Sequence, residues 1–336
     1  MSPRRRSPRA LAGLGLLAAI SLGLGGAFSG ATFSRTSSNP SNSLAANSSF
    51  QRGMASGTYT GNATDARQIA GLGFRPDIVI VKSTAAQGAA IRTRTMSGDQ
   101  TKPVSGATAI GTNRIESLGA DGFQLGTDAT VNASGVAYQW WAATTRSGEI
   151  AAGSYLGDGA AARDVTTPGM SPEAVMLLPS SATSVPILIS GMSPAARLDT
   201  ATTLASSLTD LEPDGFQVGN STSANTSGTT YHWVAFSEAP GSVDIGSYSG
   251  NNTAGRVVSG LGLTPAFTLV RAAPTASRNG MFRAEAWAAN ASSYFSASAN
   301  PTTGITSFGA GSFTVGNLTH VNASAVAYSY IALADF

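Results

Sequence analysis

The stretch Gly57-Thr-Tyr-Thr-Gly-Asn62 occurs three times in this chain, in slightly altered form. Its later copies are Gly153-Ser-Tyr-Leu-Gly-Asp158 and Gly246-Ser-Tyr-Ser-Gly-Asn251. The tyrosines at their centres lie 155 − 59 = 96 and 248 − 155 = 93 positions apart. Similarity at a fixed period of this length indicates a structural module repeated in tandem. The sequence therefore predicts three modules of about 95 residues each.

A second motif recurs towards the end of each copy. It reads Asp121-Gly-Phe-Gln-Leu-Gly126, Asp214-Gly-Phe-Gln-Val-Gly219 and Ser312-Phe-Thr-Val-Gly316. An aromatic segment follows, in which Tyr138 and Trp140 of the first copy flank one polar residue. This alternation is typical of a β-strand.

Short apolar runs occupy the same place in the three copies, each after a proline. They are Ile78-Val-Ile-Val81, Val175-Met-Leu-Leu178 and Phe267-Thr-Leu-Val270. Continuous runs of this kind predict strands buried on both faces. The module length is close to that of a single β-sandwich. We therefore predict an all-β chain of three tandem antiparallel β-sandwich modules.

The chain divides into five segments. These are a signal peptide (1–31), a Ser/Asn-rich linker (32–56) and modules at 57–148, 149–241 and 242–336. Short polar turns containing glycine join the modules, and we interpret them as hairpins. Such tight tethers predict a semi-rigid rod or a compact triple unit. No module follows the last strand, so we expect an uncovered edge there, where another copy can dock.

The N-terminal segment predicts export. Arg4, Arg5, Arg6 and Arg9 precede a short apolar stretch and small residues that suit a cleavage site. A retained anchor is the alternative, but the stretch is short for a membrane span. We expect contact with a membrane only through this leader before cleavage, and an extracellular or cell-surface location.

The charge balance changes once the leader is removed. The chain has 20 basic and 18 acidic residues, and four of the basic ones lie in residues 1–31. The mature net charge is then 16 − 18 = −2, which argues against a nucleic-acid partner. Cysteine is absent, so an exported chain must be held together without disulfides.

Two resemblances follow from these residues. The stretch 31–45 resembles the post-leader region of proteins exported with a SipW-type signal peptidase, such as camelysin and TasA-like matrix proteins. The opening motif, Leu72-Gly-Phe-Arg-Pro-Asp-Ile-Val-Ile-Val-Lys82 and the loop 126–135 resemble a repeat of bacteriophage virion and tail-associated proteins. That resemblance implies a concanavalin-like or jelly-roll sandwich with a structural or attachment role, and it implies no catalytic residues.

Three repeated arginines are the candidate ligand-binding residues. Arg67, Arg163 and Arg256 each stand eight positions after the opening tyrosine. A guanidinium group can present its fork of donors to a sugar hydroxyl or a carboxylate. The alternative is an ion pair inside the module with Asp121 or Asp214, and we favour this structural role.

Aromatic residues offer a second candidate. The repeated tyrosines, with Trp140 and Trp233, are expected in the core, because aromatic residues dominate packing in small domains. Trp141 and Trp287 have no aromatic counterpart in the other copies. If any tryptophan is exposed for binding, we expect these two.

The repeated Asn-x-Ser loops at 131–135, 224–228 and 321–325 suit tight turns. They are also formal glycosylation acceptors, and we favour the turn role.

Catalysis has little support in the sequence. Only two histidines occur, His232 and His320, at unrelated places, and no nucleophile elbow appears. Zinc sites of the His/Cys type lack ligands, whereas calcium bound by carboxylates stays open. We predict no cofactor and no enzymatic activity. The expected function is that of a structural or adhesive surface protein, binding glycans or its own copies. A multivalent carbohydrate-binding array is the alternative, and a polysaccharide-active enzyme is less favoured.

Overall fold

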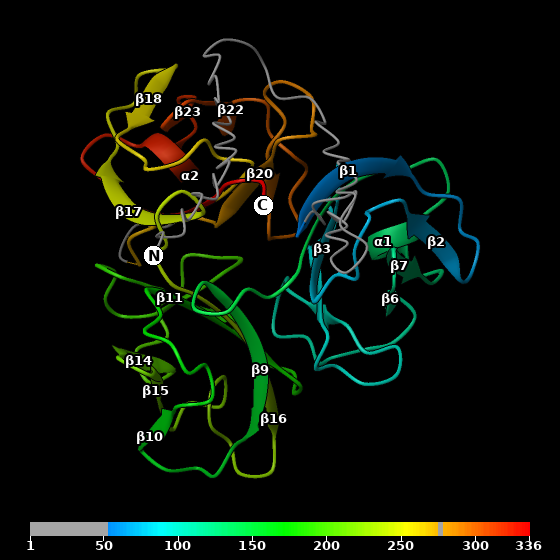
Figure 1. The fold of residues 1–336 in the computed structure, drawn as a ribbon, viewed down its shortest axis with the longest axis vertical. Coiled ribbons are helices and arrows are strands. Elements are labelled where there is room, and N and C mark those ends of the chain that lie inside the picture. Colours follow the sequence, from blue (N-terminus) through cyan, green and yellow to red (C-terminus); the bar gives the residue numbers. More distant parts are fainter. Residues whose placement is uncertain (1–52, 275–277) are drawn as a thin grey trace, which may run out of the picture. The chain divides into compact units, whose positions relative to one another are not determined.

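The computed structural model of the protein describes residues 53–274 and 278–336 (Figure 1). These residues all belong to one compact unit. The predicted signal peptide (1–31) and most of the predicted linker (32–56) lie outside the described residues. The first strand, β1, begins at Met54, inside the range assigned to the linker.

The first module holds a five-stranded sheet, in the order β1-β8-β3-β4-β5, and a three-stranded sheet, in the order β2-β7-β6. Every pairing is antiparallel. The elements are β1 (Met54–Thr60), β2 (Arg67–Ala70), β3 (Ile78–Ser83), β4 (Ala90–Thr93), β5 (Lys102–Pro103), β6 (Ile115–Gly119), β7 (Gly122–Leu125), α1 (Ala129–Asn132) and β8 (Ala137–Ala143).

The second module repeats this topology as β9-β16-β11-β12-β13 and β10-β15-β14. Its strands are β9 (Ile150–Leu156), β10 (Ala162–Val165), β11 (Ala174–Pro179), β12 (Pro186–Ile189), β13 (Ala196–Arg197), β14 (Leu208–Glu212), β15 (Gly215–Gly219) and β16 (Thr230–Phe236).

The third module repeats it again as β17-β24-β19-β20-β21 and β18-β23-β22. Its elements are β17 (Val243–Ser249), β18 (Arg256–Ser259), β19 (Phe267–Ala272), β20 (Met281–Ala284), β21 (Ser293–Tyr294), β22 (Ile305–Gly309), β23 (Ser312–Val315), α2 (Thr319–Asn322) and β24 (Ala327–Leu333). The predicted all-β architecture of three tandem repeats is confirmed.

Within each module the two sheets pack face to face. In the first module, Val79 and Val81 of β3 share one buried cluster with Phe123 and Leu125 of β7. Corresponding clusters fill the second and third modules. The closing motif thus supplies the phenylalanine that joins the two layers.

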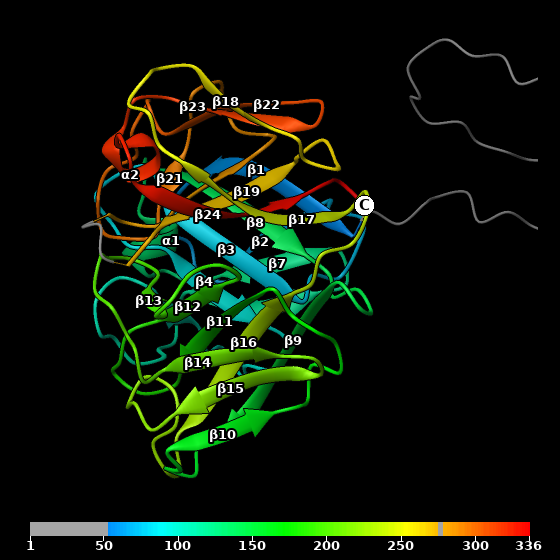
Figure 2. The same cartoon turned by 90° about the vertical axis from the view of Figure 1, so that its left-hand side faces the viewer.

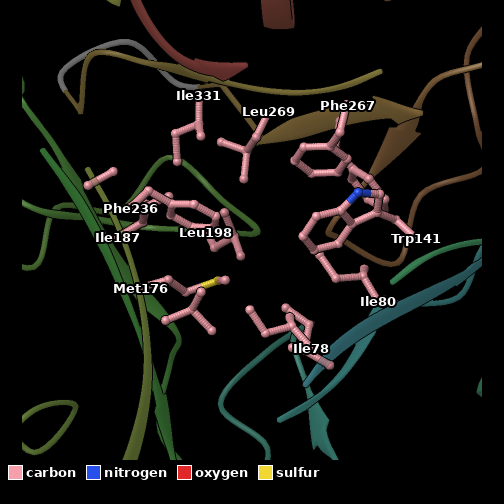
Figure 3. Close-up of a cluster of buried hydrophobic side chains, with 14 of the residues drawn as sticks. Ile78, Ile80, Trp141, Met176, Ile187, Leu198, Phe236, Phe267, Leu269 and Ile331 are labelled. Carbon is pink, nitrogen blue, oxygen red and sulfur yellow. The ribbon is translucent and has the colours of Figure 1, made fainter. Parts of the chain in front are cut away.

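A fourth buried cluster joins the three modules to one another. It contains Ile80 and Trp141 of the first module, Met176 of the second, and Phe267 and Leu269 of the third. Figure 3 shows these side chains converging on one space, where the rings of Trp141 and Phe267 stack at 4.4 Å. The modules therefore form a compact triple unit, the second of the two arrangements expected.

The shared core explains the apolar runs. All six residues of β3, β11 and β19 are buried, because one face of each strand packs inside its module and the other faces the shared core. The prediction of strands buried on both faces is confirmed.

Two expectations about strand ends are wrong. The last strand, β24, pairs with β17 on one side and β19 on the other, so it lies inside its sheet and offers no docking edge (Figure 2). Each turn between modules closes with one antiparallel bridge, between Arg146 and Ile150 and between Ala239 and Val243. The strands that these turns join, such as β8 and β9, belong to different sheets and do not pair as a hairpin. The backbone nitrogen of Gly53 donates a hydrogen bond to the carbonyl oxygen of Phe336, which joins the start of the first module to the end of the third.

Candidate functional site

The opening motif owes its first glycine to a close approach between strands. Gly57 of β1 lies opposite Trp140 of β8, and a Cβ atom at Gly57 would lie 2.7 Å from the indole ring. The same atom at Gly153 would lie 2.1 Å from Trp233. Distances this short are a severe overlap, so only glycine lets the closing-strand aromatic ring lie flat against the first strand.

The opening tyrosine stacks on the closing tyrosine. The Tyr59 and Tyr138 rings lie 5.1 Å apart and are tilted by 14°, and the other modules repeat this pair at 5.3 and 5.2 Å. The Tyr59 hydroxyl donates to the Val131 carbonyl oxygen at 2.5 Å. The Tyr138 hydroxyl donates to the Ala129 carbonyl oxygen at 2.7 Å. Burial, reinforced by the neighbouring Tyr138, raises the pKa of Tyr59 well above its ordinary value.

Each repeated arginine lies over its opening tyrosine. The guanidinium carbon atoms of Arg67, Arg163 and Arg256 are 4.8, 5.0 and 5.4 Å from the ring centroids. Nη1 of Arg67 also donates to the Thr60 carbonyl oxygen at 2.5 Å, and Nη1 of Arg163 donates to that of Leu156. All three side chains are half-buried.

The expected pairing of these arginines with Asp121 or Asp214 is wrong. The Asp121 carboxylate accepts hydrogen bonds from the Gly71 and Gly73 nitrogens, at 3.1 and 2.6 Å. Arg163 instead forms an ion pair with Asp158, 3.4 Å away and five positions before it in the chain. The arginines thus have a structural environment, as favoured, but different partners.

Each module also has a buried asparagine in the segment before its closing strand. Asn132 is fully buried. Its Oδ1 accepts from the Asn62 nitrogen at 3.0 Å, and its Nδ2 donates to the carbonyl oxygens of Thr64 and Gly126 at 2.8 and 2.9 Å. Asn225 and Asn322 hold equivalent contacts. The repeated Asn-x-Ser loops therefore connect two segments of the module, and their amides are enclosed in the fold.

The tryptophans proposed for binding are buried. Trp141 and Trp287 are 1% and 3% exposed, and both belong to the shared core. The Trp287 indole nitrogen donates to the Trp140 carbonyl oxygen at 3.3 Å. The expectation that either ring is exposed is wrong, since both lie on the face that each module turns towards its neighbours. The core position expected for Trp140 and Trp233 is confirmed.

Sequence reasoning missed a set of buried cations at the module boundaries. Lys82 Nζ donates to the Ser298 carbonyl oxygen of the third module at 3.2 Å. Arg271, at the equivalent place in the third module, donates to the Arg197 and Thr200 carbonyl oxygens of the second, at 3.0 and 2.6 Å. Burial lowers the pKa of Lys82 to about 8 and that of Arg271 to about 10.

Both histidines are engaged in structural contacts. His232 Nδ1 lies 2.8 Å from the Thr95 hydroxyl of the first module. His320 Nδ1 accepts a hydrogen bond from the Asn279 nitrogen at 2.8 Å. Among the residues described, no group of three or more acidic or histidine side chains is placed to hold a metal ion. No helix within 53–274 or 278–336 is long and apolar enough to cross a membrane.

Comparison with known proteins identifies one family. Residues 47–152 are similar to a family described as a domain of unknown function (DUF7483). The matched range runs from just before β1 into β9, and so spans the first module. A search of curated proteins found no match to the chain.

Proposed function

We propose that this chain is an exported, non-catalytic structural or adhesive protein of a surface or fibre, built from three jelly-roll or concanavalin-like sandwiches. The shared core is the observation that carries the proposal. It joins the three modules into one unit, and in a chain without cysteine it takes the place of the disulfides that stabilise many exported proteins. The repeated tyrosine, arginine and asparagine residues also support a structural role, because their contacts lie within each module and hold it together.

The test follows the purified mature chain as its concentration rises. Analytical ultracentrifugation is expected to show self-association, or labelled protein is expected to bind to cells of the producing organism. A chain that stays monomeric and binds no cell surface would contradict the proposal. Mass spectrometry of the secreted protein tests export separately, since a cleaved leader leaves a chain that begins near residue 32.

A multivalent carbohydrate-binding array is the second candidate. Arg67, Arg163 and Arg256 are half-buried, and each lies beside the exposed residues of its opening loop. Linked weak sites of this kind gain avidity by about 10²–10⁴.

Substitution of the three arginines tests this second candidate. A glycan array with the chain carrying Arg67→Met, Arg163→Met and Arg256→Met should lose signal, whereas the exposed Arg75→Met control should keep it. If no glycan gives a saturable response with the natural chain, the carbohydrate-binding hypothesis fails and the structural hypothesis stands.

A further inference from the structure

The second module contains a cavity of about 420 Å³ at the edge of its sandwich. On one side it is bounded by the loop between β12 and β13, and on the other by β14. The lining residues used below are Leu188, Gly191, Met192, Pro194, Leu208 and Asp210.

In the other two modules an arginine occupies the equivalent place. Arg92 of β4 pairs with Val79, Arg283 of β20 pairs with Thr268, and Leu188 of β12 pairs with Val175. These three pairings are equivalent in the three sheets. The second module therefore has a leucine where its neighbours have an arginine.

Carbonyl oxygens surround the arginine in the other modules. The Arg92 guanidinium donates to the carbonyl oxygens of Met96, Gly98, Gln100 and Ile115. The first three belong to the loop after β4, and Ile115 begins β6. The guanidinium thus bridges the loop and the smaller sheet.

Arg283 repeats this contact in the third module, donating to the carbonyl oxygens of Trp287, Ala288 and Ala291. A guanidinium group has five donors and no acceptor, which suits a ring of carbonyl oxygens.

The loop of the second module has changed together with the side chain. The paired residues that flank it are separated by 102 − 91 = 11 positions in the first module and by 293 − 282 = 11 in the third. In the second module the separation is 196 − 187 = 9. The carbonyl oxygens of Gly191 to Pro194 accept no hydrogen bond from another described residue. The acceptors remain, but the internal guanidinium is missing.

The cavity also has a carboxylate that the other modules lack. Asp210 lines it and is exposed. At the equivalent positions, Ser117 and Ser307 stand in the first and third modules. No lysine or arginine lines the cavity. The lining therefore favours a cation.

We propose that this cavity of the second module binds a guanidinium group supplied from outside the chain. The guanidinium enters between the shortened loop and β14, donates to the loop carbonyl oxygens and faces the Asp210 carboxylate. Either a free small guanidinium compound or an arginine side chain of a partner supplies it. Leu188 and Leu208 pack against the aliphatic part of the ligand, as apolar residues commonly do beside an arginine stem.

The test uses N-acetylarginine methylamide and its citrulline analogue, which has the same shape and no charge. Amide resonances of the full mature chain are followed by NMR up to about 10 mM probe, where a millimolar site is saturated. Saturable shifts at Gly191 and Asp210 are expected with the arginine probe alone. Equal shifts with citrulline, or no saturable shift, would overturn the proposal.

Two variants locate the site. Asp210→Ser is expected to weaken binding about fivefold, the effect of losing one exposed ion pair. Asp214→Ser removes a charge from the same β14–β15 hairpin but outside the cavity, and it should leave binding unchanged. Equal affinities for the two variants would refute the site.

A third variant fills the cavity from inside, and a peptide distinguishes the sources of the ligand. Leu188→Arg should abolish binding, because its own guanidinium group would occupy the cavity. If this variant fails to fold, the comparison of Asp210→Ser with Asp214→Ser still tests the proposal. An acetylated pentapeptide with a central arginine that binds more tightly than the small probe indicates a partner protein. Equal affinity indicates a free guanidinium compound.

Discussion

Lys102 Nζ lies 3.0 Å from the Ser181 carbonyl oxygen, across the boundary between the first and second modules. It also donates to the carbonyl oxygens of Thr108 and Thr183. At the other two boundaries the buried cation stands at the end of a central strand, as Lys82 or Arg271. The second module has Leu178 at that position, and Lys102 reaches the boundary from the opposite module instead.

Replacing Lys102 with methionine is therefore expected to destabilise the folded chain. The substitution keeps an unbranched side chain of similar length but leaves three carbonyl oxygens without their donor. The expected loss is about 1–3 kcal/mol of unfolding free energy, measured by chemical denaturation. The exposed Arg75→Met variant is the control for loss of a charge.

A second substitution tests whether the position of the cation matters. Leu178→Lys places a lysine where the first module has Lys82, and it should recover part of the stability lost in Lys102→Met. If Lys102→Met alone is as stable as the natural chain, the cost of burying the charge equals what its hydrogen bonds contribute.

Acid is expected to weaken the boundary at His232. Burial, with a smaller effect of Arg92, lowers the pKa of His232 to about 4 from its ordinary 6.5. The unfolded chain therefore binds a proton below pH 6.5, whereas the folded chain does so only near pH 4. This contribution to stability is complete above pH 6.5 and is lost as the pH falls towards 4, by about 2 kcal/mol at pH 5.

His232→Gln separates this effect from other titrations. Between pH 7.5 and 5, the unfolding free energy of the His232→Gln variant should fall by about 2 kcal/mol less than that of the natural chain. Burial also lowers the pKa of His320, so part of the slope remains. Identical slopes for the two proteins would show that His232 is not the group responsible.

The repeat and its strands could be predicted from the sequence because they depend on local pattern. Apolar runs such as Ile78–Val81 are visible without a structure, and their continuity indicates burial on both faces. The sequence does not show what covers the second face of these strands. The contact of Trp141 with Phe267 joins residues far apart in the chain, and no local pattern encodes it.

The partners of the repeated polar residues were hidden for a similar reason. The position of Arg67 is visible in the sequence because it repeats, but its contact with the Tyr59 ring depends on how the two sheets of the module pack together. The buried cations are partly visible in the sequence, since Lys82, Leu178 and Arg271 occupy one repeated position and differ in charge. The compensation by Lys102 is visible only across a module boundary.

Asn132 is expected to be essential to the stability of the first module. Asn132→Ala removes a buried amide that contacts two loops, and it leaves backbone groups of Thr64 and Gly126 without partners. A loss of about 1–3 kcal/mol is expected. The exposed Asn317→Ala variant should cost less than 0.5 kcal/mol, the usual range for surface positions. Equal effects of the two substitutions would show that the cluster around Asn132 contributes little.

The shared core predicts that the three modules unfold together. Trp141 packs on Phe267 of the third module, and the cluster continues to Met176 of the second. Trp141→Ala removes a large side chain from this cluster and should cost about 3–5 kcal/mol. Calorimetry should show one transition in both proteins, shifted to lower temperature in the variant, with equal calorimetric and van't Hoff enthalpies. Separate transitions, only one of them shifted by Trp141→Ala, would show instead that each module is stable alone and that the apolar faces merely touch.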